Sequence, residues 1–591
     1  MNSARLSWRL LRGGGRKGMV GAALTLAAVA VSSLLLVFAV AVNHAFDGRA
    51  ERAEWRNPPA HGKAVQVTAE RPKGAVAVQA VDGENLGGRV LTIVRFAVLK
   101  DGVKPPEGLR RLPKPGEVML SPALAELIER RGTSVAGLPP APAGSPRIGD
   151  GALVHPDELV AVVGHAPKDP EVAKARKDLS VREIPPVWIK GFDNKALDEA
   201  VAYQALATVA TALMVVPLLV FGGAAARLTV ARRDQRLAAL RLIGATPGQV
   251  VAMTVAEAVV VAFAGSVLGA VLYGVAMPFL SRVEIGGGPW FTADLWPGLP
   301  YVLAVVLAVP LLVGVSAVVG LRRVVVSPLG VAKRETPPGM RFVRVIALLA
   351  VLAVFPALGV GVRMDVFPAM SLAVGVIAVM VGLAFLCVNL AGPWVVALIG
   401  RIVSRLARTP AMLLAGRRLV DDPRSAWRTV SGVAMTGFVA GFIGLLAPGE
   451  WALEPDDLAG VQMFADIRTG TVVVLTVSFL VAIASAGITA VSSILDRRQT
   501  YALLHLAGTP LSVLDWARRA ETLIPLAVMG GGSIAAGAFA AMPFMIAGPN
   551  AAGLVPLLVS IAVGFVGVVA AGEMSRPLLR SVTLDPAPRP D

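Results

Sequence analysis

The chain has 591 residues, of which 55% are hydrophobic and 16% are charged, and its formal net charge is +16. Soluble proteins contain about 25% charged residues, so this composition excludes a soluble protein. Apolar runs of about 20 residues, the length that crosses a bilayer as a helix, recur along the whole chain. We therefore predict a polytopic α-helical membrane protein. Its single cysteine, Cys387, allows no intrachain disulfide.

Ten apolar runs are long enough to cross the hydrocarbon core. The first run also fits a cleaved signal peptide, because five basic residues precede it and Ala39, Val40 and Ala41 mimic a cleavage site. Its 24 residues exceed the usual apolar core of a signal peptide, so we interpret it as a retained span. The fifth run is weakened by Pro356 and Gly359. The predicted spans are 19–42, 200–226, 250–280, 299–320, 344–362, 367–392, 429–447, 470–492, 518–546 and 554–572.

Basic residues in short loops stay preferentially in the cytoplasm and so indicate the orientation of the spans. With the N-terminus inside, the predicted cytoplasmic segments hold 30 lysines and arginines, against 3 in the short outer loops. We predict a multi-pass protein of the bacterial plasma membrane, with both termini in the cytoplasm and residues 43–198 outside. Trp290 and Trp296, near the outer end of the fourth span, are interpreted as interfacial anchors. The positive charge follows from this topology and indicates no nucleic-acid partner.

The long segment 43–198 is predicted to be a water-exposed domain. A run at 121–132 predicts a helix with Ser121 as its N-terminal cap, and the charged run 168–183 predicts a solvated helix. Alternating or β-branched residues predict strands at 64–70, 74–81, 89–99 and 158–165. The mixture indicates one small extracytoplasmic α+β domain.

Two basic segments of the chain match one another. Residues 232–248 precede the third span, and residues 496–512 precede the ninth. Aligned on Gly244 and Gly508, both have an arginine pair upstream, a Thr-Pro pair just after the glycine, and a glutamate thirteen residues beyond it. A shared offset of that length indicates an internal duplication.

A second similarity, between residues 7–18 and 416–428, extends the predicted duplication to a four-span unit. The chain then consists of two such units joined by two linking spans. The predicted segments are 1–42 with the first span, 43–198 as the extracytoplasmic domain, 199–321 as the first three-span unit, 322–343 as a cytoplasmic linker, 344–392 as the linking spans, 393–469 with the seventh span and a short outer loop, 470–575 as the second three-span unit, and 576–591 as a cytoplasmic tail.

The first copy carries a motif of a known family. Arg241, Ile243, Gly244, Ala245 and, early in the next span, Glu257 resemble the motif of the FtsX-like permeases of ABC transporters, the mechanotransmission or macrolide-exporter type. In the outer segment, residues 115–127 and 148–164 resemble the extracytoplasmic segments of actinobacterial members of that family. The resemblance thus implies a ten-span member with two FtsX-like repeats.

The second copy departs from the motif at His505, Ala507 and Thr509. Both copies also lack the glutamate usual eight residues before the glycine, where Arg236 and Thr500 stand instead. The contact that this glutamate makes to the ATPase in the family is therefore not carried over.

The resemblance implies a permease subunit that works with a separate cytoplasmic ABC ATPase, acting as a dimer and binding ATP and magnesium. The two basic segments would then dock on that ATPase. The other interpretation of their arginines is anchoring at the cytoplasmic membrane surface. The candidate coupling residues are Arg232, Arg233, Arg236, Arg241, Gly244, Arg497, Arg498 and Gly508.

No Walker-type phosphate-binding loop occurs in the sequence, and the glycine-rich stretch 13–18 lacks its spacing. The sequence also contains no H-E-x-x-H, C-x-x-C or paired-carboxylate pattern. We predict no catalytic, cofactor-binding or metal-binding residues in this chain, which is not expected to be an enzyme. ATP hydrolysis belongs to the partner.

Two glutamates follow the basic segments, Glu257 and Glu521. A charge at the centre of a bilayer costs about 2.5 kcal/mol or more, so we favour interfacial helices for both over a proton or substrate role. Gly265 and Gly269 form a G-x-x-x-G pattern inside the third span, which predicts close helix packing.

The leading hypothesis is an ABC-transporter permease that couples ATP hydrolysis to motion of the outer domain and to export or extraction of an amphipathic or hydrophobic substrate. The alternative is a transmembrane signalling protein that gates an extracytoplasmic enzyme or sensor without transport. A secondary transporter is disfavoured, because no span presents paired buried charges and the two copies share one topology. Membrane lipid is a further expected partner, and the alternative adds an extracytoplasmic protein.

Overall fold

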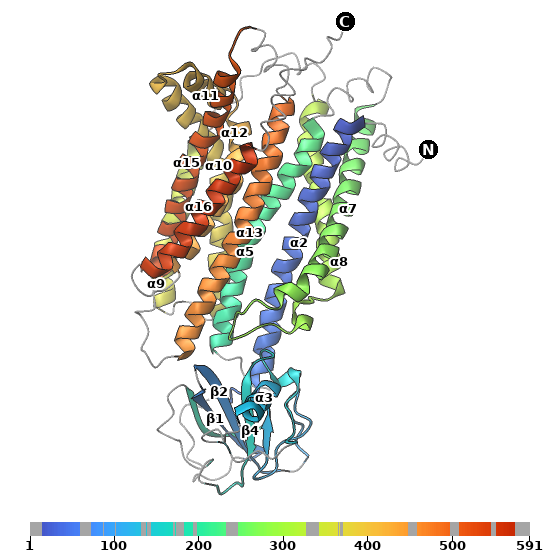
Figure 1. Cartoon of the computed structure of the whole chain (residues 1–591), viewed down its shortest axis with the longest axis vertical. Coiled ribbons are helices and arrows are strands. Elements are labelled where there is room, and N and C mark those ends of the chain that lie inside the picture. Colours follow the sequence, from blue (N-terminus) through green and yellow to red (C-terminus); the bar gives the residue numbers. More distant parts are fainter. Residues whose placement is uncertain are drawn as a thin grey trace.

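The computed structural model describes residues 15–58, 73–86, 88–100, 102–131, 138, 144–169, 172, 182–192, 198–231, 246–326, 342–364, 366, 370–446, 458–496, 507–544 and 551–573. A long helical bundle carries a small sheet domain at one end (Figure 1). We call the bundle end beside the sheet domain, where α2 finishes at Glu54, the domain end. The opposite end, where α2 begins at Gly15, is the far end.

The helices of the bundle follow the predicted spans in chain order. They are α2 (Gly15–Glu54), α5 (Asp198–Ala231), α7 (Pro247–Leu280), α8 (Leu299–Val326), α9 (Val343–Arg363), α10 (Met370–Leu406), α11 (Pro410–Asp421), α12 (Pro423–Leu446), α13 (Leu458–Asp496), α15 (Leu511–Ala541) and α16 (Ala551–Glu573). Every predicted span coincides with one of these helices, and α11 is a short additional helix at the far end. The chain is a polytopic helical membrane protein, as predicted.

Eight helices are long and apolar enough to cross a membrane within the described residues. They include α9, whose Pro356 lies inside the helix without ending it. The described apolar parts of α5 and α16 are shorter, Ala200–Val215 and Ile561–Glu573. The total of ten spans therefore stays a prediction.

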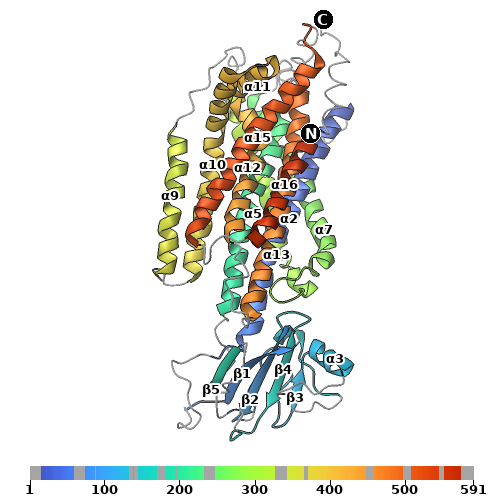
Figure 2. The same cartoon turned by 60° about the vertical axis from the view of Figure 1, so that its left-hand side comes forward.

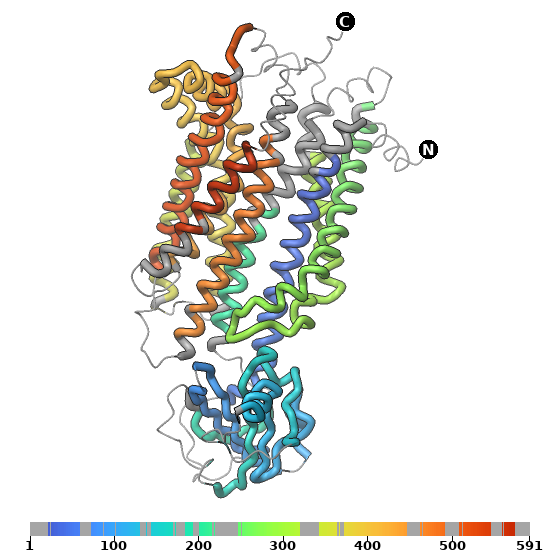
Figure 3. Tube along the Cα trace, viewed as in Figure 1, coloured from blue at the N-terminus to red at the C-terminus, as the bar shows by residue number. Residues whose placement is uncertain are grey.

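Three helices extend well beyond the apolar runs that predicted them. α2 continues past residue 42 to Glu54, α10 continues past residue 392 to Leu406, and α13 begins at Leu458, before residue 470. Hydropathy marks where a helix meets water, whereas the backbone hydrogen bonds of a helix can continue beyond that point, as those of α10 do past Pro393. The extra turns carry α2 out of the bundle and into the sheet domain (Figure 3).

Two four-helix units share several of their helix contacts. In the first, α2 packs on α5 and α7, and α5 on α8; in the second, α12 packs on α13 and α15, and α13 on α16. The units meet where α5 contacts α13, and α9 and α10 lie to one side (Figure 2). α7 also packs on α8, whereas the corresponding helices α15 and α16 make little contact in the described residues. The internal duplication therefore stays a prediction.

Glycines allow the closest helix contacts in both units. A Cβ atom added at Gly269 of α7 would lie 2.3 Å from the Ala30 carbonyl oxygen of α2, and one at Gly265 would lie 2.9 Å from that of Leu26. In the second unit, a Cβ added at Gly537 of α15 would lie 2.1 Å from the Phe438 carbonyl oxygen of α12. The packing role predicted for the G-x-x-x-G pattern is confirmed.

α7 begins with a complete capping box. The Thr246 side chain accepts a hydrogen bond from the Gln249 backbone, the Gln249 side chain accepts one from the Thr246 backbone, and Pro247 occupies the first helical position. These bonds satisfy two of the amide groups that a helix N-terminus leaves free. The Thr-Pro pair that follows Gly244 in the sequence thus marks the start of a helix.

The sheet domain has one five-stranded sheet in the order β3-β4-β2-β1-β5. β2 pairs with β4 in parallel, and the other neighbours are antiparallel. The strands are β1 (Ala77–Leu86), β2 (Arg89–Val98), β3 (Val118–Leu120), β4 (Leu159–Gly164) and β5 (Arg182–Ile189). The domain is α+β, as predicted.

Alternating residues of β2 cover two different faces. Leu91 and Ile93 lie in one cluster with Leu124 of α3 (Pro122–Arg131), whereas Val94 and Phe96 lie in another with Trp55, just beyond the end of α2. One face of the sheet is therefore covered by α3 and the other by the end of α2.

The sequence predicted β1, β2, β4 and α3, and the Ser121 cap of α3 is confirmed by a 3.3 Å hydrogen bond from the Leu124 amide. The predicted strand 64–70 lies outside the described residues. The end of the predicted helix 168–183 is wrong, because residues 182 and 183 belong to β5. β5 and the short β3 were not predicted. β5 contains two consecutive prolines, which argue against a central strand but are tolerated at this edge of the sheet.

The contact between α2 and α7 gives a first testable prediction. Gly269→Ala should destabilise the purified chain by about 1–3 kcal/mol, because the new methyl group forces the two backbones apart. Gly274→Ala on the same helix is the matched control, since a Cβ there has no neighbour within 4 Å. Thermal unfolding in detergent measures the difference. Equal midpoints for both variants would show that α2 and α7 do not pack this closely.

Candidate functional site

Three arginines line the last turns of α2 and the residues just beyond it. Arg49, Arg52 and Arg56 have the spacing i, i+3 and i+7, which places them along one side of a helix. Arg49 and Arg56 are buried, with 4% and 5% of their surface exposed. Buried guanidinium groups need acceptors for their N–H bonds, so their partners identify what this stretch binds.

Arg49 binds the loop that joins α7 to α8. Its guanidinium stacks over the Trp290 ring, 3.4 Å from the ring centroid. It donates to the backbone carbonyls of Ile285, Gly286 (3.5 Å), Gly288 (3.3 Å) and Pro289 (2.7 Å). Gly286 and Gly287 have positive φ angles, which let the loop turn its carbonyls toward one cation. One side chain of α2 thus fixes the α7–α8 loop. Trp290 was predicted as an interfacial anchor, but it is 6% exposed and packs under this arginine.

Arg52 joins that loop to the sheet domain. Its guanidinium forms an ion pair with Asp294 in the short 3-10 helix η2 (Thr292–Leu295), and its Nε donates to the Leu153 carbonyl at 2.9 Å. Asp294 belongs to the α7–α8 loop and Leu153 to the sheet domain. The same arginine therefore holds both.

Arg56 holds the sheet domain itself. It pairs with Glu158 and donates to the Ala152 carbonyl, and Trp55 Nε1 donates to the same carbonyl at 3.3 Å. Gln79 of β1 donates to the Trp55 carbonyl at 2.8 Å. The end of α2 is therefore bound to β1 and to the segment before β4 by side chains and backbone together.

Glu158 is the anion of this contact. It also accepts a 2.6 Å hydrogen bond from the Val154 amide. Burial alone would raise the pKa of its carboxyl, but the attraction and hydrogen bonds of Arg56 hold that pKa below its usual value. The carboxyl stays ionised and the pair stays charged at neutral pH.

His155 lies between the sheet domain and the α7–α8 loop. A Cβ added at Gly288 would lie 2.3 Å from its Nδ1 atom, so the ring sits directly against this glycine. The pKa of His155 is lowered to about 4, mainly by burial. The negative charge of Glu158 acts to raise this pKa, and the positive charge of Arg49 acts to lower it. The ring is neutral at neutral pH.

The second unit reaches the same loop through α13. Asp466 accepts a 2.6 Å hydrogen bond from the Tyr203 hydroxyl of α5 and a 3.3 Å hydrogen bond from the Gly287 amide. It is 8% exposed. We call the set formed by Arg49, Arg52, Arg56, Glu158, His155 and Asp466 the junction; it brings together α2, α5, α13, the α7–α8 loop and the sheet domain.

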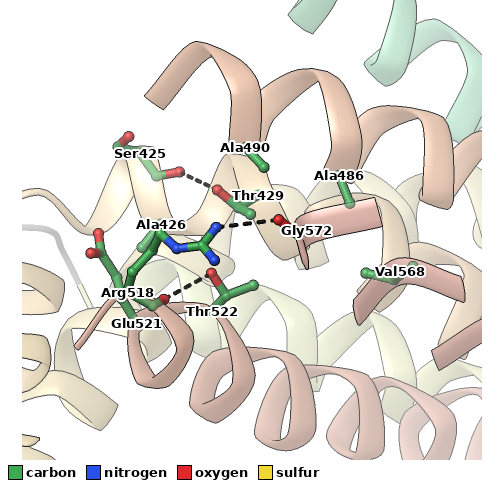
Figure 4. Close-up of a pocket in the computed structure, with 10 residues that line it drawn as sticks. All are labelled: Ser425, Ala426, Thr429, Ala486, Ala490, Arg518, Glu521, Thr522, Val568 and Gly572. Atoms are coloured by element: carbon green, nitrogen blue, oxygen red, sulfur yellow. Dashed lines mark hydrogen bonds between the residues drawn. The ribbon is translucent and has the colours of Figure 1, made fainter. Parts of the chain in front are cut away.

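A second charged cluster lies toward the far end, at α11, α15 and α16. Arg418 of α11 lies 3.5 Å from Glu521 of α15, and Arg519 lies 3.0 Å from Glu573 of α16. Arg518 donates to the Gly572 carbonyl at 3.2 Å, beside a cavity of about 50 Å³ (Figure 4). That volume admits a few water molecules but no substrate of ordinary size.

The predicted coupling residues fall mainly outside the described residues. This holds for Arg232, Arg233, Arg236, Arg241, Gly244, Arg497 and Arg498. Gly508 has φ +88° in the turn before α15, a conformation that favours glycine. Their role in coupling stays a prediction.

The two glutamates are placed by the structure. Glu257 is half-buried in α7, and Glu521 lies in α15 beside Arg418. Both helices continue into the bundle as candidate spans and are not separate interfacial helices. Pairing with α11 explains how Glu521 is accommodated.

The junction was not predicted from the sequence. Its arginines stood in a segment assigned to the outer domain, and nothing in the composition set them apart. The available signal was their spacing, because three arginines on one side of a helix that emerges from a span require a common set of acceptors. Among the described residues, no group of three His, Cys, Asp or Glu side chains could hold a metal ion.

Comparison with known families identifies the first unit. The FtsX-like permease C-terminal family matches residues 205–326. These residues include α7 and α8, most of α5, and the first basic segment. This part of the chain is an FtsX-like permease domain. No curated protein matches the chain.

The FtsX-like permeases are membrane subunits of transporters and normally work with a cytoplasmic ABC ATPase. The chain is therefore a multi-pass cell-membrane protein of the ABC permease type. The junction attaches the sheet domain to this permease domain, because Arg49 and Arg52 bind residues 285–294, inside the matched segment.

The Arg56–Glu158 pair gives a second prediction. Arg56→Gln should destabilise the contact of α2 with the sheet domain by about 3 kcal/mol, because it leaves a buried carboxylate without its cation. Arg56→Gln combined with Glu158→Gln should recover part of the loss. Hydrogen exchange of residues 150–164 measures the effect. Arg130→Gln, which breaks an exposed pair with Glu126, is the control and should change stability by less than about 0.5 kcal/mol. An equal, small effect of both single changes would contradict the buried pair.

His155 gives a third prediction. Its pKa is lowered to about 4 in the folded state, against about 6.5 in an unfolded chain, so the unfolded state takes up the proton first as pH falls. Docking of the sheet domain should therefore be fully stable above about pH 6.5 and weaken by up to about 3 kcal/mol as pH approaches 4. His155→Gln should reduce this dependence. Hydrogen exchange of residues 150–158 across this range is the measurement, and an unchanged profile in His155→Gln would refute the assignment.

Proposed function

We propose that this FtsX-like permease is the membrane subunit of an ABC transporter and passes motion from a cytoplasmic ATPase to the sheet domain through α2. The observation that carries the proposal is the continuity of α2. This one helix of 40 residues runs from the far end of the bundle to the sheet domain, where Arg52 and Arg56 attach it. A helix transmits a push or a rotation along its axis because its backbone hydrogen bonds keep it stiff.

The charge of the short loops supports a cytoplasmic far end. The helices that run toward this end lead into the segments rich in lysine and arginine, and those segments stay in the cytoplasm in membrane proteins generally. The sheet domain then lies outside the cell membrane, together with the junction. ATP with magnesium would be bound by the partner, since the sequence has no Walker-type loop.

One chain supplies two similar units and two basic segments, 232–248 and 496–512. We therefore propose that one permease chain binds two ATPase subunits, one at each segment. ATP-driven closure of the two subunits would move the far ends of both units, and the junction would convert that movement into motion of the sheet domain.

The transported substrate is proposed to be amphipathic or hydrophobic and to be exported or extracted from the membrane. Two features support this substrate class. The candidate spans expose long apolar faces, as on α7 and α8. The sheet domain lies beyond the domain end of the bundle. A substrate that leaves the lipid at the domain end would meet the sheet domain first.

The proposal predicts that the basic segments hold the ATPase. Reversing charge at Arg232, Arg233 and Arg236 together should weaken the complex with the cognate ATPase roughly tenfold or more. Each exposed charge pair contributes about 1 kcal/mol or less, so the triple change is needed. The pair Arg497 and Arg498 should act similarly but more weakly, because the second copy departs further from the family motif. Pull-down of the ATPase at equal expression is the measurement.

A matched control reverses three exposed arginines of the sheet domain, Arg110, Arg130 and Arg147. This variant has the same change of net charge and should bind the ATPase normally. Unchanged ATPase binding in both segment variants would return their arginines to membrane anchoring and would remove the docking step from the proposal.

A further inference from the structure

α10 carries one continuous row of exposed apolar side chains. The row is Val379, Leu383, Leu386, Leu390, Leu398, Ile402 and Leu406. Val379, Leu383, Leu386 and Leu390 share one side of the helix. Beyond Leu390, steps of four residues pass through the half-buried Trp394 and turn the row gradually around the helix to Leu406. The row ends on Leu406, which is 72% exposed at the last residue of the helix. A side of a spanning helix that stays apolar and uncovered along its length faces lipid.

Arginines enter this row at the far end of α10. Arg401 and Arg405 are exposed one turn apart, next to Ile402 and Leu406. Arg408 follows in the short link to α11 and is also exposed. Within the described part of the chain, none of the three forms an ion pair with a carboxylate.

α11 folds back against the same end of α10 (Figure 2). A Cβ added at Gly400 would lie 2.7 Å from the Leu419 Cβ, and one at Gly416 would lie 2.7 Å from the Ser404 amide nitrogen, so the two helices cross closely. The crossing buries Leu419 and leaves Met412 and Leu413 exposed. The fold therefore fixes a second apolar patch next to the arginines.

Neighbouring arginines of α11 have opposite environments. Arg418 is 11% exposed in its side chain and pairs with Glu521, whereas Arg417 is exposed. We call the surface formed by Arg401, Arg405, Arg408, Arg417, Ile402, Leu406, Met412 and Leu413 the α10–α11 corner. It combines four exposed cations with four exposed apolar side chains.

The length of α10 places the corner beyond the hydrocarbon core. The helix has 37 residues and is about 55 Å long, whereas the core of a bilayer is about 30 Å thick. The Trp394 ring contacts Phe342 at the start of α9, with 5.3 Å between the ring centroids, so lipid-facing apolar surface reaches at least this level. Residues 401–408 continue past it toward the far end, beyond the length of helix that the hydrocarbon core requires.

We propose that the α10–α11 corner binds the headgroup of an anionic phospholipid. Arg401, Arg405 and Arg408 would hold the phosphate and the negative headgroup, while the apolar side chains beside them contact the acyl chains. A lipid fits better than a soluble protein, because the corner lies at the end of a candidate membrane span and places exposed cations directly beside exposed apolar side chains. The proposal does not depend on transport or on an ATPase.

The test uses native mass spectrometry of the purified full chain in detergent, titrated with phosphatidylglycerol or with phosphatidylcholine. We expect wild type to retain phosphatidylglycerol preferentially. Each basic residue beside an anionic membrane surface is worth about fivefold in affinity. The variant Arg401→Gln, Arg405→Gln, Arg408→Gln should therefore lose at least about tenfold in phosphatidylglycerol binding, with little change for phosphatidylcholine.

Two further variants make the result specific. Arg110→Gln, Arg130→Gln, Arg147→Gln changes the net charge equally in the sheet domain and should leave lipid binding at the wild-type level. Ile402→Ser with Leu406→Ser should weaken both lipids. Unfolding midpoints equal to wild type confirm that the variants fold.

Equal retention of phosphatidylglycerol by wild type and the Arg401, Arg405, Arg408 variant would overturn the proposal. Loss of ATPase binding in that variant, without any change in lipid retention, would also overturn it and would assign the corner to the protein partner.

Discussion

The rest of the structure depends on the contact between the guanidinium groups at the end of α2 and the carbonyls and carboxylates around them. Arg49 donates hydrogen bonds to the carbonyls of the glycine-rich α7–α8 loop. Arg52 links that loop to the sheet domain, and Arg56 forms an ion pair with Glu158. Arginine suits this contact because its guanidinium carries several N–H donors for the carbonyls of the loop and a positive charge for the carboxylates of Asp294 and Glu158. Without this contact, the sheet domain would be attached to the bundle through its chain connections to α2 and α5 and through apolar packing alone.

The two units share part of their helix packing but have different attachments. The first unit carries the sheet domain between α2 and α5, whereas the corresponding connection in the second unit spans residues 447–457 only. The second unit reaches the junction through Asp466, whose partners are Tyr203 of α5 and the Gly287 amide. Motion of either unit can therefore act on one loop. At the far end, the additional elements belong to the second unit instead. These are α11 and the Arg418–Glu521 pair.

A linkage of this kind suits export and transmembrane signalling alike. Both require that a movement on one side of the membrane change the position of a domain on the other, and a stiff helix with charged contacts at its end satisfies that need. The cavity beside Arg518 is too small for a substrate, so it does not favour transport through that part of the bundle. What distinguishes the two functions is the surface that the sheet domain presents to its partner.

Hydropathy alone determined the number and order of the long helices, because a membrane-spanning segment must satisfy its own backbone hydrogen bonds and must be apolar for about 20 residues. Alternation and β-branched residues determined β1, β2 and β4, and a serine followed by an apolar run determined α3. The spacing of Gly265 and Gly269 identified a helix contact, since small residues at that spacing let two backbones approach. These features are local, so sequence patterns can reveal them.

Tertiary structure decided what joins these parts. β5 forms despite Pro185 and Pro186, because an edge strand needs hydrogen bonds on one side only. The partners of Arg49 lie more than 230 residues away in sequence, and those of Arg56 about 100, so no local pattern could name them. Glu521 was predicted as a charge near the membrane interface, but only the fold shows that Arg418 from a separate helix neutralises it. The sequence shows that a charged side chain in a buried segment needs a partner. Which partner it has depends on how distant segments pack together.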